Sequence, residues 1–138
     1  MSIVLDNSVT MRWCFGDGSS GDLDYAAKLA RALRTETAEV PAIWGLEVAN
    51  VLARAESTGK LPASMMSTFL STLRKMRIHP DPETATHALT DTLSLARKYK
   101  LSAYDAAYLE LAMRKQLPLA TLDVDLRKAA KRADVTIF

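Results

Sequence analysis

Short apolar segments alternate with longer amphipathic ones along almost the whole chain, and this alternation restricts the fold more than any other feature. The apolar run at 2–5, SIVL, stops at Asp6, which is typical of a buried strand that ends in a turn. The segment 22–34 then places its leucines and several alanines on one helical face. Strands that alternate with helices pair in parallel, because each crossover helix covers a face of the sheet. We therefore predict an α/β fold with a mainly parallel sheet flanked by helices.

The remaining segments continue the same pattern. Short strands are predicted at 39–40, 77–80, 118–122 and 135–138, which brings the sheet to about five strands. Helices are predicted at 42–58, 63–76, 83–99, 101–115 and 124–132, and residues 16–21 are predicted to form a loop. A chain of 138 residues is long enough to bury one hydrophobic core, so we expect a single domain over 1–138.

Composition excludes several classes of protein. With 49% hydrophobic and 25% charged residues, the chain has the composition of an ordinary globular protein rather than a disordered one. Cys14 is the only cysteine, so an intramolecular disulfide and a cysteine-rich zinc site are both excluded. The most apolar stretch, 40–53, is interrupted by Glu47, so we expect a cytoplasmic protein with neither a signal peptide nor a membrane span. The net charge of +2 is too small to indicate a nucleic-acid partner by itself.

Four acidic residues stand at positions where a parallel sheet places ligands. Asp6 and Asp123 directly follow predicted strands, Asp105 lies in the first turn of its helix, and Glu47 lies in the second turn of another. Ligands of open parallel sheets bind beyond the carboxyl ends of the strands, where the strand order reverses. Taken singly, each residue also has an ordinary explanation, since aspartates cap turns and helices and a helical glutamate is commonly exposed.

Together, the four acids indicate a metal site. Carboxylates that crowd together raise one another's pKa values, so a cluster of them persists only by sharing protons or by binding a cation. Oxygen ligands suit Mg²⁺ or Mn²⁺, and neither histidine, His79 or His87, stands beside an acid. One or two such ions would hold a phosphodiester and lower the pKa of an attacking water, so the chemistry indicated is phosphodiester hydrolysis.

Four motifs in this order resemble the PIN-domain nucleases, and among them the VapC-type toxins of bacterial and archaeal toxin–antitoxin pairs. The motifs are VLDNSV at 4–9, LEVANVL at 46–52, LSAYDAAYLELA at 101–112 and LATLDVDL at 119–126. The resemblance spans nearly the whole chain. It implies a three-layer sandwich around a five-stranded parallel sheet, an acidic Mg²⁺ or Mn²⁺ site, endoribonuclease activity and inhibition by a cognate VapB-type antitoxin. It also implies a homodimer.

The resemblance assigns roles to individual residues of this chain. The family's catalytic and metal-binding acids correspond to Asp6, Glu47, Asp105 and Asp123. Supporting groups around them are expected at Ser8, Asn50, Thr121 and Asp125. Ser8 and Thr121 match small hydroxyl residues near two of the acids, and Asn50 lies one helical turn from Glu47. Asp125 either contacts a metal through a water molecule or stabilises its helix by placing a negative charge near the positive end of the helix dipole.

Contacts to RNA are expected from residues close to the acidic site. Arg127 and Lys128 follow Asp123 closely enough to reach the phosphates of an RNA strand. Trp13 is a candidate for stacking on an unpaired base, although large aromatic residues usually fill the core.

Two other functions remain open at this stage. The first is a catalytically silent PIN-like scaffold that only binds partners, against which the presence of all four acids argues. The second is a Mg²⁺-binding receiver-type signalling domain, which needs paired acids after the first strand, whereas Asp6 is followed by Asn7. The sequence also leaves open whether DNA is cut, because no residue in it reads a 2′-hydroxyl group.

Overall fold

Four short strands form a fully parallel sheet in the order β3-β2-β1-β4. In this computed structural model, which describes residues 1–138, the strands are β1 (Ser2–Leu5), β2 (Thr37–Val40), β3 (Ile78–Pro80) and β4 (Leu119–Ala120). The predicted strand at 135–138 contributes only one bridge, between Leu119 and Ile137, because β4 offers just two residues to a neighbour. The α/β fold is confirmed, with four strands instead of about five.

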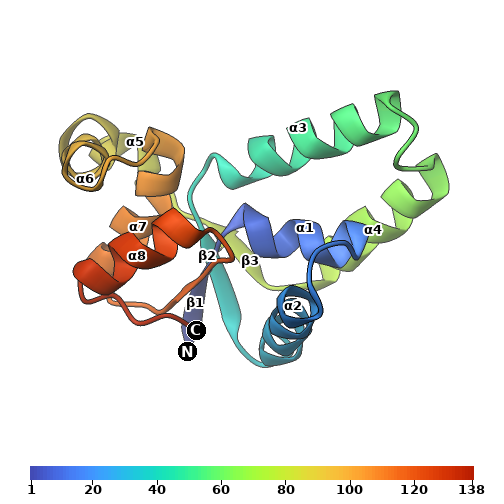
Figure 1. Cartoon of the computed structure of the whole chain (residues 1–138), viewed down its shortest axis with the longest axis horizontal. Helices are drawn as coiled ribbons and strands as arrows, with labels where there is room; N and C mark the ends of the chain where they lie inside the picture. Colours follow the sequence, from blue (N-terminus) through green and yellow to red (C-terminus); the bar gives the residue numbers. More distant parts are fainter.

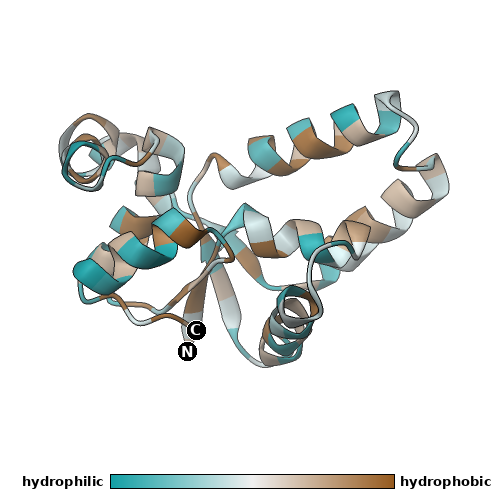
Figure 2. Ribbon diagram, viewed as in Figure 1, coloured by the Kyte–Doolittle hydropathy of each residue, from teal (hydrophilic) through white to brown (hydrophobic).

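Helices connect the strands and cover both faces of the sheet (Figure 1). They are α1 (Asn7–Phe15), α2 (Ser20–Ala32), α3 (Trp44–Ser57), α4 (Ala63–Lys75), α5 (Thr84–His87), the π-helical turn η1 (Ala88–Thr92), α6 (Leu93–Tyr99), α7 (Ala103–Lys115) and α8 (Val124–Arg132). Hydrophilic and hydrophobic residues alternate along α3 and α8, as expected of helices with one buried face (Figure 2). No helix is both long enough and apolar enough to cross a membrane.

Two helical segments differ from the prediction. Residues 7–15 form α1, for which the sequence shows no regular apolar period; the helix is held by tertiary packing, since Val9 and Met11 are buried in two different clusters. The single helix predicted over 83–99 is divided by the π-helical turn η1. Within that turn the Thr90 hydroxyl donates to the carbonyl of His87, a side-chain bond that competes with the regular helical pattern.

The side chains of β1 alternate between the two faces of the sheet and thereby create three layers. Ile3 and Leu5 point to one face, where they pack with residues of α1 and α2. Val4 points to the other face and packs with α7 and α8. All three side chains are almost fully buried. This period-two alternation is what places helices on both sides of a parallel sheet.

A third apolar cluster lies away from the sheet. It joins α1 to the hairpin formed by α3 and α4, through Met11, Val48, Leu52 and Phe69. The hairpin extends outward from the body of the molecule (Figure 1). Because α1 and α3 begin at β1 and β2 respectively, the cluster fixes how these two helices diverge from the carboxyl end of the sheet.

One ion network anchors α7 to the segment after β3. Arg114 donates to Glu110 within α7 and to Asp81, and it also contacts Glu83. Asp81 and Glu110 are 2% and 4% exposed, so Arg114 compensates two buried carboxylates. This bonding lowers the pKa of Asp81 against the opposing effect of burial.

Removal of Arg114 is expected to destabilise the fold strongly. Arg114→Met keeps an apolar stem but leaves Asp81 and Glu110 without their cation, so we expect the free energy of unfolding to fall by about 3 kcal/mol. Urea unfolding at neutral pH measures the change. Arg97→Met, at an exposed arginine of α6 that has no ion pair, is the matched control and should change stability by less than about 0.5 kcal/mol. Equal stability of the two variants would contradict a structural role for the network.

Candidate functional site

The four acidic residues singled out in the sequence all lie at the start of a helix. Asp6 and Asp123 are the N-cap residues of α1 and α8, and Glu47 and Asp105 lie in the first turns of α3 and α7. The chain passes from β1 to β2 and β3 on one side, and β4 pairs on the opposite side of β1. Asp6 and Asp123 therefore stand where the strand order reverses, and the positive ends of four helices favour negative charge there.

Asp6 is the most buried of these acids, with only 4% of its surface exposed. Two hydroxyl groups donate to its Oδ2 atom, from Ser8 at 2.6 Å and from Thr121 at 2.7 Å. The same hydroxyls accept backbone amides of the loop after β4, Leu122 N–H by Ser8 and Asp123 N–H by Thr121. Ser8 and Thr121 thus tie the end of β1 to the end of β4 and orient the Asp6 carboxylate.

Loss of one of these hydroxyls is expected to be costly. Thr121→Val preserves shape and β-branching but removes a donor to buried Asp6 and an acceptor for the amide of Asp123. Leaving such groups unpaired costs about 1 to 3 kcal/mol, which urea unfolding detects. Thr136→Val, at an exposed threonine whose side chain makes no hydrogen bond, is the control. If both variants unfold alike, the bonds to Asp6 contribute nothing to the fold.

The acids are close enough to affect one another's ionisation. Burial raises the pKa of Asp105 to about 6, and the negative charges of Asp6, Asp123 and Glu47 add to the shift. Burial also raises the pKa of Asp6 and of Glu47. All of these shifts favour the neutral form, so the folded protein pays an electrostatic penalty for full ionisation of the group, which a bound cation would relieve.

The donor atoms in this region suit a hard divalent cation. They are carboxylate oxygens, joined by the side-chain oxygen of Asn7, which is buried beside Asp6 without a hydrogen-bond partner. Mg²⁺ and Mn²⁺ bind such oxygen ligands. The oxygen donor atoms of these residues therefore fit Mg²⁺ or Mn²⁺.

The carboxylates do not already converge on one point. No three acidic, histidine or cysteine side chains are arranged to hold a metal ion together. Two of the carboxylates already have hydrogen-bond partners: Tyr108 O–H donates to Glu47 Oε1 at 2.5 Å, and Asp123 Oδ1 accepts the amide of Leu126 as the cap of α8. The other oxygens of these two carboxylates, Glu47 Oε2 and Asp123 Oδ2, make no hydrogen bond.

The other residues singled out in the sequence differ in exposure and in hydrogen bonding. Asn50 is exposed on α3, one turn beyond Glu47, and Asp125 and Lys128 are exposed on α8. Arg127 is more restricted, because its Nε donates to the Thr121 carbonyl at 2.7 Å and its guanidinium lies 4.9 Å from the centre of the Tyr25 ring.

Trp13 packs against the interior of the protein. Its indole N–H donates to the carbonyl of Ala26 at 2.8 Å, and its ring packs between two of the apolar clusters. The alternative explanation given by the sequence, a packing role, is the one that the structure supports. We do not include Trp13 among the RNA contacts proposed below.

The arrangement of strand-end acids in a parallel sheet agrees with a comparison to known families. The sequence profile of the PIN domain family matches residues 3–132. The chain belongs to the PIN domain family. The match includes all four acids and, apart from Ser2 of β1, every strand of the sheet. No curated protein matches this PIN domain significantly.

Solved structures share the fold of this PIN domain. PAE2754 from Pyrobaculum aerophilum is 20% identical, with a TM-score of 0.66 and coverage of 94% of this chain and 87% of its own. FitAcB from Neisseria gonorrhoeae is 20% identical, with a TM-score of 0.60 and coverage of 100% and 96%. VapBC2 from Rickettsia felis, solved bound to a DNA fragment from the promoter, is 14% identical, with a TM-score of 0.67 and coverage of 100% and 98%. At these identities the similarity establishes the fold.

Sequence reasoning missed two residues of this PIN domain that contact or adjoin the acids. Tyr108 lies three residues after Asp105 in α7 and is fully buried, yet its hydroxyl reaches Glu47 from a segment 61 residues away. A buried tyrosine needs a partner for its hydroxyl, which is the only signal that the sequence carried. Asn7 follows the turn predicted after 2–5, but it begins α1 and its side-chain oxygen is buried.

Proposed function

We propose that this PIN domain is a divalent-metal-dependent endoribonuclease and the toxin of a toxin–antitoxin pair. The observation that carries the proposal is the position of four acids at four helix N-termini, near enough to one another that burial and their mutual repulsion raise the pKa of Asp105 to about 6. A site of this kind favours a cation over empty, fully ionised carboxylates.

In this proposal the ion is Mg²⁺, which Mn²⁺ can replace, and it is held by Asp6, Glu47, Asp105 and Asp123. When bound, it neutralises charge on the scissile phosphate and lowers the pKa of an attacking water. Without the ion, burial raises the pKa of Asp105 to about 6, and binding of the cation would favour its ionised form.

The surrounding side chains orient the acids. Ser8 and Thr121 donate hydrogen bonds to Asp6, and Tyr108 donates one to Glu47. Asn50 and Asp125 are near enough along their helices to bind waters of the site. The helix N-termini also favour the negative charge of the phosphate itself. Arg127 and Lys128 are the RNA contacts proposed on α8.

The biological setting follows from the motifs and from the named neighbours. The sequence resembles VapC-type toxins, and one structural neighbour carries the corresponding name, VapBC2, while another is FitAcB. We therefore propose a VapB-type antitoxin as the partner, RNA as the substrate and the cytoplasm as the place of action. A homodimer is also proposed, consistent with the exposed leucines Leu46, Leu89 and Leu93.

A silent binding scaffold is the second candidate. One observation favours it, namely that no three acids form a ready-made metal site. We rank it lower because a scaffold has no need of an acidic cluster in which the pKa values of Asp6, Glu47 and Asp105 are raised.

Cleavage of mixed cellular RNA by the purified protein tests the proposal. Parallel reactions contain Mg²⁺, Mn²⁺ or EDTA, and the ends of the products are mapped by sequencing. Discrete cuts that depend on metal are expected. Intact RNA in every reaction, with structured and unstructured species well represented, would instead favour the scaffold.

A further inference from the structure

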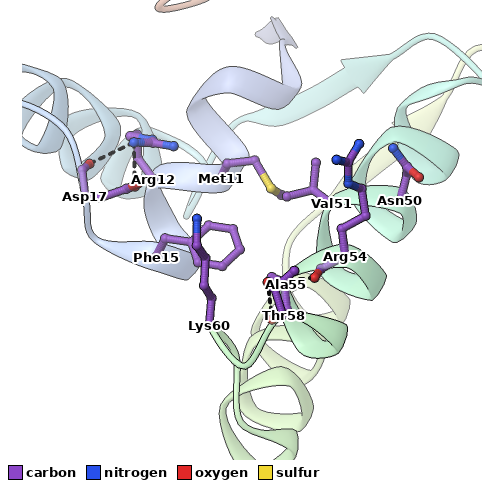
Figure 3. A pocket seen from close by; sticks show the side chains of 10 residues that line it. All are labelled: Met11, Arg12, Phe15, Asp17, Asn50, Val51, Arg54, Ala55, Thr58 and Lys60. Carbon is purple, nitrogen blue, oxygen red and sulfur yellow. Dashed lines mark hydrogen bonds and ion pairs between the residues drawn. The ribbon is translucent and has the colours of Figure 1, made fainter.

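A groove with cations along its rim opens between α1 and the α3–α4 hairpin (Figure 3). It encloses about 530 Å³. Phe15, Met11 and Val51 form an apolar floor, and Arg12, Arg54 and Lys60 lie along the sides. The groove therefore combines an aromatic, apolar surface with positive charge.

The groove lies along two helices that begin at the acidic site. The two helices that border it, α1 and α3, both begin at that site, with Asp6 capping α1 and Glu47 in the first turn of α3. Glu47, Asn50 and Arg54 follow one another at spacings of three and four, which places them on one face of α3. At about 1.5 Å per residue, Arg54 lies roughly 10 Å along the helix from Glu47.

Two of the three cations are not neutralised by the protein. Arg12 is paired with Asp17, to which it is bonded at 2.5 Å. The side chains of Arg54 and Lys60 are exposed and make neither a hydrogen bond nor an ion pair. Figure 3 shows Arg54 and Asn50 on α3, on one side of the groove, and Phe15 on the opposite side, on α1.

From this geometry we infer that the groove binds the single strand of RNA on one side of the cleavage point. Arg54 and Lys60 contact backbone phosphates, and Phe15 stacks on an unpaired base. This inference rests on the proposed function, because it assigns the strand's path from the acids outward. It explains how a site lined by carboxylates retains a polyanion, since the attraction comes from the adjoining groove.

The composition of the groove favours a nucleic-acid strand over an acidic peptide. Proteins that bind single strands combine a positively charged groove with aromatic side chains that stack on bases. Phe15 and the two free cations supply both parts within one hollow. An acidic peptide would use the cations but gives no reason for the groove to lie on the two helices that begin at the proposed cleavage site.

A binding measurement separates this groove from general electrostatic attraction. The parent protein is Asp105→Asn, which we expect to bind RNA without cutting it. The probe is a fluorescent single-stranded RNA of mixed sequence. The test variant adds Arg54→Glu and Lys60→Glu. The control adds Arg31→Glu and Arg34→Glu, which line a separate basic pocket. Like Arg54 and Lys60, one of these two residues lies in the last turn of a helix and the other lies shortly after it. Fluorescence anisotropy gives the Kd at several salt concentrations, and circular dichroism confirms folding.

The groove variant is expected to bind RNA roughly tenfold more weakly than the parent or worse. Its dependence of log Kd on log salt should be shallower by about 1.4, since two phosphate contacts are lost from a single strand. The control should stay within about twofold of the parent Kd. Phe15→Leu should weaken binding about fivefold without a change in the salt slope, because stacking releases no counterions.

Unchanged affinity and salt slope in the groove variant, or equal losses in the control, would overturn the inference. If the wild-type protein still cuts RNA in that case, the proposed function stands and the strand runs elsewhere. If the parent binds no RNA and the wild type cuts none, both the inference and the proposed function are wrong.

Discussion

Asp105→Asn is expected to abolish metal-dependent RNA cleavage and, at the same time, to stabilise the metal-free fold. The substitution keeps the shape of the side chain and the cap of α7, in which the Asp105 amide bonds to the Ser102 hydroxyl. It removes a charge from the proposed metal site, so we expect cleavage in Mg²⁺ to fall at least about a hundredfold. Initial rates on a labelled RNA that contains a mapped cut site measure this loss.

The gain in stability follows from the raised pKa. The pKa of Asp105 is about 6 in the folded protein and 3.8 in the unfolded chain. The free energy of unfolding therefore falls as the pH rises from about 3.8 through 6. At pH 7.5 the neutral asparagine avoids this loss. We expect the metal-free variant to be more stable by about 1 to 2 kcal/mol, less than the roughly 3 kcal/mol of the full shift because water partly screens the group.

Urea unfolding in EDTA at two pH values checks the sign. Near pH 4 the wild-type carboxyl is largely protonated, so the advantage of the variant should nearly vanish there. Asp24→Asn, the same change at an exposed aspartate of α2, should alter neither stability nor cleavage appreciably. Full activity of Asp105→Asn, or a loss of stability at pH 7.5, would show that the four acids do not act as one site.

Binding of Mg²⁺ or Mn²⁺ is expected to weaken steeply as the pH falls below 6. The pKa values of Asp6, Glu47 and Asp105 are all raised, so protons compete with the ion for these carboxylates. Each proton displaced on binding makes the apparent affinity fall by up to about tenfold per pH unit. We expect the Kd for Mn²⁺ to rise roughly tenfold or more between pH 6 and pH 5, and cleavage at subsaturating metal to fall with it.

Calorimetric titrations at pH 7.5, 6 and 5 measure this effect, and the proton release at each pH is obtained from buffers of different ionisation enthalpy. Circular dichroism of the protein in the same buffers shows whether it stays folded at pH 5. An affinity that is constant from pH 7.5 to pH 5 would mean that the ion does not bind to the acids with raised pKa values.

The sequence predicted the parts of the fold that depend on local pattern. The strand at 2–5 and the helices near 22–34, 63–76 and 124–132 are found within one or two residues of their predicted ends. It missed α1, whose residues show no clean apolar period because they pack against two clusters at once. It overestimated the last strand, because whether 135–138 pairs depends on the length of its neighbour β4 and not on its own residues.

The same division between local and distant effects holds for the acidic site. A carboxylate after a strand is visible in sequence, so the positions of Asp6 and Asp123 at the strand ends could be predicted. The hydrogen bonds that hold Asp6 and Glu47 join residues 115 and 61 positions apart, and no local pattern announces them.

The groove could not be predicted because its cations are scattered. The basic residues that the sequence displays as runs lie elsewhere, while Arg54 and Lys60 stand alone among neutral or acidic neighbours. They meet Phe15 only because α1 and the α3–α4 hairpin pack together. A surface built from single residues of several elements is visible only after folding.

Titration of the metal-free protein with Mn²⁺ at pH 7.5, beside Asp105→Asn, tests most directly whether the four acids form a metal site. We predict saturable binding by the wild type that is weakened at least about tenfold in the variant, with Asp24→Asn unchanged. Binding of equal strength by the wild type and Asp105→Asn, or no binding by either, would contradict the account.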